Sequence, residues 1–308
     1  MINEPQLVTV APGVHAWIGA GGDSNAGAIE TPDGLLVIDA QQYPRLARQF
    51  RDALRAATHD KPLRMLINTH CHLDHTSGNV VFADLPILAH EKTLLAMEAG
   101  LGPLCGDHWT ITDFATKLRM LFGQNIMELV ADGDPARAWF RQRISLPDYD
   151  TVTIAPPTQT FADLFTFHLP NEIVHLNYWG PAHCDGDIVV HLEKSRVVFL
   201  GDLLFHGRFP WLGDCDLDGW IDRLARVLTL DVAVVIPGHG GPTNLRSVAA
   251  FRDMLTELRR AVDHAIKAGW SEDAAVRDVQ LPQYAAINRY KDWMPIDVRA
   301  AYRYLRGR

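Results

Sequence analysis

The chain has 308 residues, a length that can bury a sizeable core within one decorated domain. With 47% hydrophobic and 21% charged residues, it has the composition of a soluble globular protein and not of a disordered or fibrous one. The formal net charge of −8 disfavours a nucleic-acid partner, because binding to phosphates depends on a basic surface.

The amino-terminal part of the sequence predicts strands first and then a helix. Short β-type runs alternate with turn signals over the first forty residues, which indicates an antiparallel meander. Apolar residues then recur at helical spacing over residues 43–57, and a further strand is predicted at 64–68. A helix near Asn79, a short strand at 86–90 and a helix at 91–99 follow.

Residues 100–150 interrupt this pattern. Thr110 and Asp113, spaced as in a helix cap, open an apolar stripe that includes Ile111, Phe114 and Leu118, which is typical of an amphipathic helix. We expect a helical insertion that forms a lid or a pocket wall.

The second half of the chain returns to strands and ends in helices. Strands are predicted at 151–155, 165–169, 172–179, 187–192 and 196–202, and another lies within the run VAVVIPGHGG. Helical patterning covers 245–268 and continues to the carboxyl end at 308. Strands flanked by helices in both halves predict a layered α/β (α+β) sandwich, with residues 1–308 forming one domain.

The strongest chemical signal is the segment His70-Cys71-His72-Leu73-Asp74-His75, which places four nitrogen or oxygen ligands within six residues after a predicted strand. Imidazole and carboxylate suit zinc and neighbouring first-row metals. A catalytic zinc site takes three protein ligands and keeps one position open, so one metal would not use all these groups and the later ones.

This segment resembles the HxHxDH signature of the metallo-β-lactamase superfamily. The resemblance extends through GPAHCDGD around His183, FLGD ending at Asp202 and IPGHG around His239. It implies a four-layer αββα sandwich over about residues 6–244, with the insertion at 100–150 and the carboxyl-terminal helices at 245–308 as variable regions. It also implies that Asp202 bridges two metals, one bound by His70, His72 and His183 and the other by Asp74, His75 and His239.

The resemblance implies a zinc-dependent hydrolase. Two Zn²⁺ ions, with iron or manganese as alternatives in one or both sites, would make a bridging hydroxide available near neutral pH, and catalytic Asp74 would help to orient it. Dedicated β-lactamases usually have cysteine or serine where this chain has Asp202. The sequence is therefore more similar to glyoxalase II-like and lactonase-like enzymes, which predicts a small or medium ester, thioester or lactone as substrate.

Four further residues are candidates for supporting roles. His206, Arg208 and Trp211 follow Asp202 on a loop that leaves the predicted metal site, so they could contact substrate, and ordinary loop packing is the alternative. Asp39 could orient a ligand-bearing loop, with a turn or helix cap as the alternative.

Other functions and the expected surroundings follow from weaker signals. A metal-binding sensor or scaffold without catalysis and a nuclease of the same superfamily are the alternatives to a hydrolase. The amino terminus has no signal-peptide pattern and no run approaches about 18 apolar residues, so we expect a cytoplasmic protein with a small-molecule partner and no membrane partner. The oligomeric state is left open, a homo-oligomer included.

Overall fold

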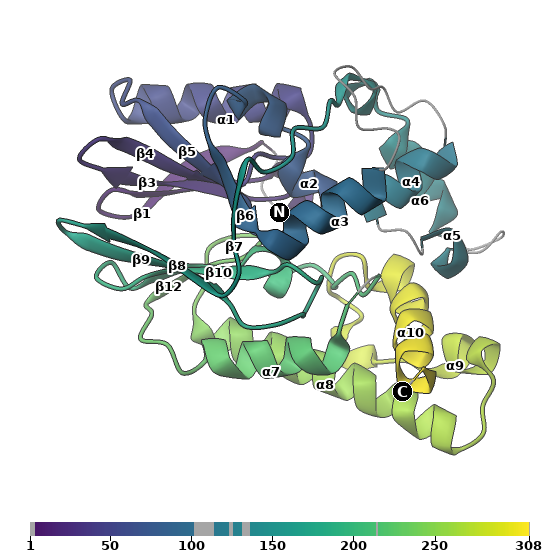
Figure 1. Ribbon diagram of the computed structural model, residues 1–308. Helices are drawn as coiled ribbons and strands as arrows, with labels where there is room; N and C mark the ends of the chain where they lie inside the picture. Colours follow the sequence, from purple (N-terminus) through teal and green to yellow (C-terminus); the bar gives the residue numbers. More distant parts are fainter. Residues whose placement is uncertain (1–3, 102–113, 123–125, 131–135, 214, 308) are drawn as a thin grey trace.

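The computed structural model describes residues 4–101, 114–122, 126–130, 136–213 and 215–307. Two β-sheets pack face to face, and helices cover the outer face of each sheet (Figure 1). The layers are therefore helix, sheet, sheet and helix, which confirms the predicted αββα sandwich.

The first sheet has seven strands in chain order, β1 to β7. The first four strands form the antiparallel meander that the sequence predicts, and the last four pair in parallel. The strands are β1 (Gln6–Ala11), β2 (Val14–Ile18), β3 (Ala26–Thr31), β4 (Gly34–Ile38), β5 (Leu63–Ile67), β6 (Ile87–His90) and β7 (Gln159–Phe161).

The second sheet has five strands in the order β12-β11-β10-β9-β8. Strands β8 to β11 pair antiparallel, whereas β11 and β12 pair in parallel. The strands are β8 (Leu164–Leu169), β9 (Glu172–Tyr178), β10 (Ile188–Leu192), β11 (Val197–Phe199) and β12 (Val234–Ile236).

Side chains that alternate along the strands build the core between the sheets. On β10, Ile188 and Val190 face the other sheet, whereas Val189 packs with the helices on the outer face. On β4, Ile38 faces inward and Val37 packs under the opposite helical layer. Each sheet is thus apolar on both faces, as a sheet buried between two layers requires.

Three helices cover the outer faces of the sheets. Helix α1 (Pro44–Ala57) buries Phe50 and Leu54 on the first sheet. Helices α7 (Leu217–Val227) and α8 (Leu245–Lys267) lie on the second sheet, and the Asp216 and Asn244 side chains cap their first turns. These capping side chains accept backbone N–H groups that the helix itself leaves unpaired.

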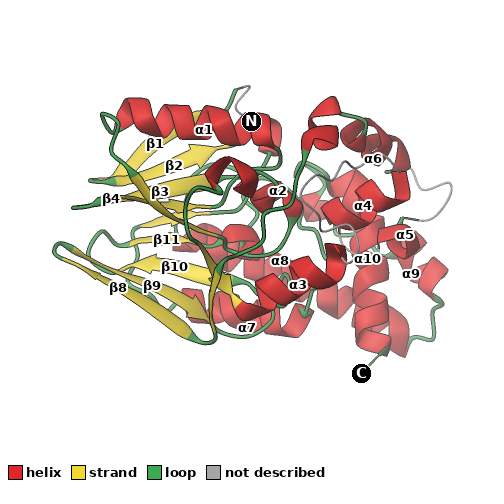
Figure 2. Ribbon diagram, turned by 45° about the horizontal axis from the view of Figure 1, so that its top comes forward, coloured by secondary structure: helices red, strands yellow, loops and turns green. Residues whose placement is uncertain are grey.

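The remaining helices gather at one end of the two sheets (Figure 2). They come from the insertion and from the carboxyl-terminal segment, and α10 contacts α5, α8 and α9. They are α3 (Glu91–Leu101), α4 (Phe114–Phe122), α5 (Ile126–Leu129), α6 (Arg137–Ile144), α9 (Glu272–Asp278) and α10 (Tyr290–Arg306). A short helix, α2 (Leu73–Thr76), lies in the His-rich loop. The predicted capping residues Thr110 and Asp113, and Ile111 of the stripe, lie outside the described residues.

One predicted strand is wrong. Residues 147–151 form a 3-10 turn, and 152–158 pair with neither sheet as a strand. Pro156 and Pro157 lack the backbone N–H that a strand interior donates, and the carbonyl of Ala155 accepts a hydrogen bond from the Asn79 side chain. Val152 is buried with the helices of the insertion, so its apolar character serves a different cluster.

No helix among the described residues is both long enough and apolar enough to cross a bilayer.

Candidate metal centre

The His-rich loop begins at the carboxyl end of β5, where neighbouring strands of the first sheet also end. His70 and His72 lie in the extended part of the loop, and Asp74 and His75 lie on α2. His183 precedes β10, Asp202 follows β11 and His239 follows β12, so the second sheet brings its residues to the same end. The packing of the two sheets therefore assembles side chains that are far apart in sequence.

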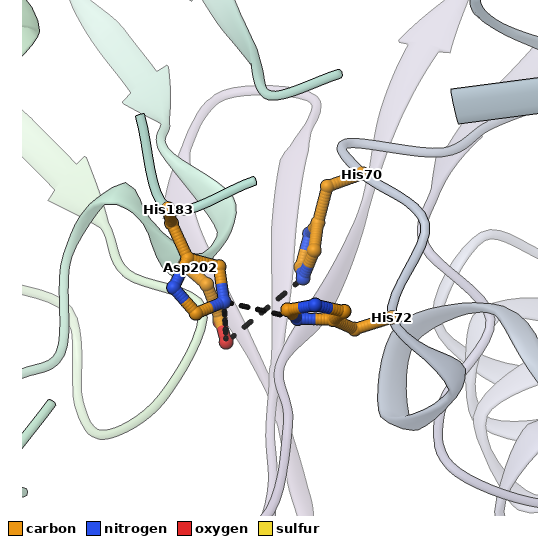
Figure 3. A group of neighbouring side chains, drawn as sticks. All are labelled: His70, His72, His183 and Asp202. Carbon is orange, nitrogen blue, oxygen red and sulfur yellow. Dashed lines mark hydrogen bonds and ion pairs between the residues drawn. The ribbon is translucent and has the colours of Figure 1, made fainter. Parts of the chain in front are cut away.

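The first group of side chains comprises His70, His72, His183 and Asp202, which point toward one another from both sheets (Figure 3). The Nε2 atom of His183 lies 3.0 Å from Nδ1 of His72 and 3.4 Å from Oδ2 of Asp202. The Nε2 atom of His70 lies 3.9 Å from the same Asp202 oxygen. All four side chains are buried.

The second group comprises Asp74, His75, His239 and again Asp202. The Nε2 atom of His239 lies 3.2 Å from Oδ2 of Asp74 and 3.3 Å from Oδ2 of Asp202. The Nε2 atom of His75 lies 3.1 Å from Oδ1 of Asp202. Asp202 is thus common to both groups, because its Oδ2 atom faces histidines of each and its Oδ1 atom faces His75.

The buried charges of this cluster are linked. Burial raises the pKa of Asp202, but the adjacent His239 and His75 outweigh it and hold that pKa well below its usual value. Burial likewise lowers the pKa of His75, but Asp202 and Asp74 raise it well above its usual value. The carboxylates of Asp202 and Asp74 thus draw positive charge toward this point, which a bound cation would also supply.

The first group is different, because His70 and His183 favour the neutral form that a metal requires. Burial and the neighbouring His72 lower the pKa of His183 to about 3. Burial and His75 also lower the pKa of His70 well below its usual value. A neutral imidazole presents a lone pair, which is the form that binds a metal ion.

Hydrogen bonds from behind orient two of these imidazoles. The Nδ1 atom of His75 lies 3.0 Å from Oδ2 of Asp39, and that of His70 lies 3.0 Å from the hydroxyl of Thr69. Thr69 in turn donates its hydroxyl and its backbone N–H to Asp39. The Nε2 atom of His70 is buried and has no hydrogen-bond partner among the described residues, and that of His75 faces Asp202. Two imidazoles that are held from behind and present Nε2 to the same carboxylate fit a metal site.

Backbone packing also fixes the His239 loop. The side chain of Asn25 donates to the carbonyls of Pro237 and Gly240, which flank His239. A Cβ atom on Gly238 would lie 1.9 Å from Oδ1 of Asp202, so this position accepts only glycine without a shift of the site.

A cavity of about 280 Å³ opens beside the second group and reaches Asp74 and His239. The amino-terminal loop, the insertion and the segment before α10 all contribute to its wall. The other lining residues are Ala20, Gly21, Asp23, Ser24, Gln42, Trp139, Arg143, Tyr149, Arg208, Asn288 and Arg289.

The three residues proposed to contact substrate lie in different places. Arg208 lines this cavity, and its Nη1 atom lies 2.8 Å from Nδ1 of His239. The His206 ring faces the carbonyl of Gly241 and borders a separate cavity. Trp211 is buried against Phe140 of the insertion. The substrate contacts of all three stay a prediction.

Sequence reasoning missed several residues that line the cavity, notably Arg143, Arg289 and Tyr149. Arg143 and Tyr149 lie in the insertion between His75 and His183, and Arg289 lies well after His239. None of the three follows a strand end. No pattern in the sequence marks them. The three cysteines of the described residues are free thiols: Cys71 and Cys184, which adjoin ligand residues, and Cys215.

Three curated proteins are similar to this chain over most of its length. The chain is 25% identical to 2,4-dinitroanisole O-demethylase subunit alpha of Nocardioides sp. (strain JS1661), over 86% of this chain and 67% of that protein. It is 23% identical to the linear primary-alkylsulfatase of Pseudomonas sp. (strain ATCC 19151), over 84% of this chain and 50% of that protein. It is also 23% identical to the human acyl-coenzyme A thioesterase MBLAC2, over 73% of this chain and 72% of that protein.

A solved structure and a family model agree on the fold. The sec-alkylsulfatase Pisa1 from Pseudomonas sp. superposes with a TM-score of 0.70 and 17% identity, over 97% of this chain and 50% of that one. The chain thus spans about half the length of both alkylsulfatases. The family model described as the metallo-beta-lactamase superfamily matches residues 19–239, which include all the side chains of the two ligand groups. The chain belongs to the metallo-β-lactamase superfamily.

Proposed function

We propose that this protein is a hydrolase with two metal ions that cleaves an ester, thioester or lactone of small or medium size. The observation that carries the proposal is the position of Asp202, whose Oδ2 atom faces His70 and His183 of the first group and His239 of the second, while its Oδ1 atom faces His75. A carboxylate shared between two ligand groups is suited to bridging two cations.

The donor set indicates which metals fit. His70, His72 and His183 would hold one ion, Asp74, His75 and His239 the other, and Asp202 both. Nitrogen and oxygen donors without cysteine suit zinc, iron or manganese, and we propose zinc. Two such ions supply Lewis acidity and an activated water near neutral pH.

The chain's own residues account for the remaining steps. Asp74 lines the cavity as well as the ligand group, so its carboxylate can accept a hydrogen bond from the attacking water and orient it. Asp39 and Thr69 hold the His75 and His70 rings in place, and this limits the reorganisation needed during the reaction.

The similar proteins support hydrolysis as the type of reaction, but they do not agree on one substrate. One relative is named as an acyl-coenzyme A thioesterase, which favours attack on a carbonyl, and another as an alkylsulfatase. A sulfate ester is a second candidate, because three arginines line the cavity and a sulfate ester is anionic.

A substrate screen on metal-reconstituted protein tests the proposal. The protein is stripped with a chelator, reloaded with zinc, iron or manganese, and assayed with p-nitrophenyl acetate, acetyl-coenzyme A, γ-butyrolactone and decyl sulfate. Hydrolysis of at least one carbonyl substrate that requires two metals per chain is the expected result. Faster cleavage of decyl sulfate selects the second candidate. Two bound metals without turnover of any substrate would favour a sensor, and faster cleavage of RNA would favour a nuclease.

A further inference from the structure

The cavity beside Asp74 is rich in positive charge. Arg143, Arg208 and Arg289 all line it, and the carboxylates of the lining are Asp23 and Asp74. Asp74 also belongs to a ligand group, so a cation bound there would take up its charge. The described wall therefore presents more positive than negative charge to a molecule inside the cavity.

Arg143 is fixed in the wall by its neighbours. Its Nη2 atom donates to Oδ1 of Asp23, at 2.5 Å, and to the side-chain oxygen of Gln42, which also accepts the hydroxyl of Tyr149 at 3.1 Å. Both contacts of Arg143 use the same nitrogen. Its Nε and Nη1 donors are therefore available to a bound group in the cavity.

Arg289 is held by stacking instead. Its guanidinium lies 4.4 Å from the centre of the Trp139 ring, and Nη1 donates to Asp292 at 3.2 Å. A stacked guanidinium keeps its N–H groups in the plane at its edge, where they can bind an oxyanion. Arg289 also adopts a left-handed backbone, with φ of 69°, immediately before α10. The chain therefore turns at Arg289, which lines the cavity directly before α10 begins.

Arg208 brings the positive charge next to the metal ligands. Its guanidinium stacks 4.4 Å from the centre of the Trp293 ring and approaches Nδ1 of His239. When Nε2 of His239 binds a metal, Nδ1 carries the hydrogen, so two donors face each other there. A negative group in the cavity would relieve this conflict.

We propose that this cavity is an oxyanion subsite, in which Arg143, Arg289 and Arg208 bind a carboxylate or sulfate group of the substrate while its reacting bond lies at Asp74 and His239. The inference rests on the proposed function and narrows its substrate to an acidic one. Arg143 and Arg289 are already held in the wall by other contacts, so they lose little conformational freedom when they bind such a group.

A pair of esters of similar size tests the subsite during turnover. Mono-p-nitrophenyl glutarate carries a carboxylate, and p-nitrophenyl butyrate is neutral. A charge-assisted hydrogen bond contributes about 1.5–3 kcal/mol, so Arg289→Gln should lower kcat/KM for the glutarate ester roughly 10- to 100-fold. The butyrate ester should change less than about 3-fold. Arg289→Lys, which keeps the charge but loses the planar fork, should fall between Arg289→Gln and the parent.

Direct binding separates the subsite from the hydrolase proposal. Calorimetry with glutarate and with sulfate, on metal-loaded protein, should show binding that Arg289→Gln weakens by a similar factor. Arg196→Gln is the matched control, because Arg196 lies in the turn between β10 and β11, at the opposite end of these strands from His183 and Asp202. Tighter binding of glutarate indicates a carboxylate substrate, and tighter binding of sulfate indicates a sulfate ester.

Each outcome decides one of the two proposals. Glutarate or sulfate binding that depends on Arg289, without cleavage of any ester, supports the subsite and contradicts the hydrolase. Cleavage of both esters with equal loss in Arg289→Gln and in Arg196→Gln, or no binding of either anion, overturns the subsite and leaves the hydrolase standing.

Discussion

Asp39 lies directly behind His75, with its Oδ2 atom 3.0 Å from Nδ1 of the imidazole and its backbone in the left-handed region at φ 57°. This contact directs Nε2 of His75 toward Asp202. A non-glycine residue pays a small conformational cost for a positive φ, and three hydrogen bonds to the Asp39 carboxylate hold it there.

Asp39→Ala should weaken metal binding without removing a ligand. Loss of a hydrogen-bond partner behind a metal-binding histidine costs about 10- to 100-fold in metal affinity. Titration against a competing chelator measures this change. Asp39→Asn keeps the shape and should lose less affinity than alanine. If both variants bind metal like the parent, the orienting role of Asp39 is refuted.

Substitution of Asp202 should lower metal affinity more than substitution of Asp39, because the Asp202 carboxylate is shared between both ligand groups. We expect about two metal ions per chain in the parent, and Asp202→Ala should lose metal and activity together. Asp202→Asn keeps the shape without the charge, so it should lower affinity for the metal pair more than about 100-fold, beyond the loss of an outer partner. Any remaining activity should shift to higher pH, because the removed charge no longer holds the cations together.

Elemental analysis and circular dichroism check this prediction. The fold should survive both substitutions, since the two sheets and their cores do not depend on this side chain. An Asp202→Asn protein with two metals and the parental rate and pH profile contradicts the bridging role.

The sequence could predict that the seven candidate ligands come together, because part of the information is local and the resemblance to the metallo-β-lactamase signature supplied the two groups. His70, His72, Asp74 and His75 share one loop, and the later ligands each follow or precede a short apolar strand. Ligand types and strand ends together placed these side chains at one edge of the sandwich. The alternation of apolar residues likewise predicted most of the strands, but not the short β7, Gln159–Phe161.

The cavity wall could not be predicted, because its residues come together only through tertiary packing. Arg143 lies on α6 of the insertion and Arg289 lies just before α10, and each is held by partners distant in sequence. Neither position differs in pattern from an exposed helical arginine. The wrong prediction of a strand at 151–155 also reflects tertiary packing. Val152 is apolar because it packs against the helices of the insertion and not within a sheet.

Trp220 on α7 supports the metal centre from the side of the second sheet. Its ring lies 5.0 Å from the His183 ring, and its Nε1 atom donates to the carbonyl of Leu203 at 3.0 Å. Trp220→Ala should lower the free energy of unfolding by about 3–5 kcal/mol, the range for a buried aromatic residue replaced by alanine. Urea unfolding measures this loss. Trp270→Ala, at a half-exposed tryptophan, is the control and should change little.

Glu172 gives a test of stability against pH. Its carboxylate accepts the backbone N–H groups of Ile173, Lys194 and Ser195. Burial raises the pKa of Glu172, but these hydrogen bonds outweigh it and hold the pKa below the usual value of 4.5. A carboxyl whose folded pKa is lowered stabilises the fold above its unfolded pKa and loses that effect as the pH falls through the folded pKa.

Glu172→Gln should therefore destabilise the protein by roughly 1 kcal/mol at pH 7, because charge-assisted hydrogen bonds are lost, and by less below pH 4.5. Urea unfolding across this range measures the difference. Glu193→Gln is the matched control, since Glu193 is exposed beside Lys194 and should contribute little. A loss of stability in Glu172→Gln that does not depend on pH would contradict the assignment.

Asp297 on α10 should change stability with pH in the opposite direction to Glu172. It is fully buried, its Oδ1 atom accepts the backbone N–H of Leu212 at 3.1 Å, and its Oδ2 atom has no hydrogen-bond partner among the described residues. Burial raises the pKa of Asp297 well above its usual value of 3.8, although the bond from Leu212 opposes this. The folded protein therefore keeps this proton while the unfolded chain releases it above about pH 3.8, so the carboxyl reduces stability progressively as the pH rises toward the folded pKa.

Asp297→Asn retains the acceptor for Leu212 and cannot ionise. It should raise the free energy of unfolding at pH 8 relative to the parent and change it less at pH 5, as measured by urea unfolding of the metal-free proteins. Equal destabilisation at both values would mean that the Asp297 carboxyl is ionised in the folded protein and paired with a cation.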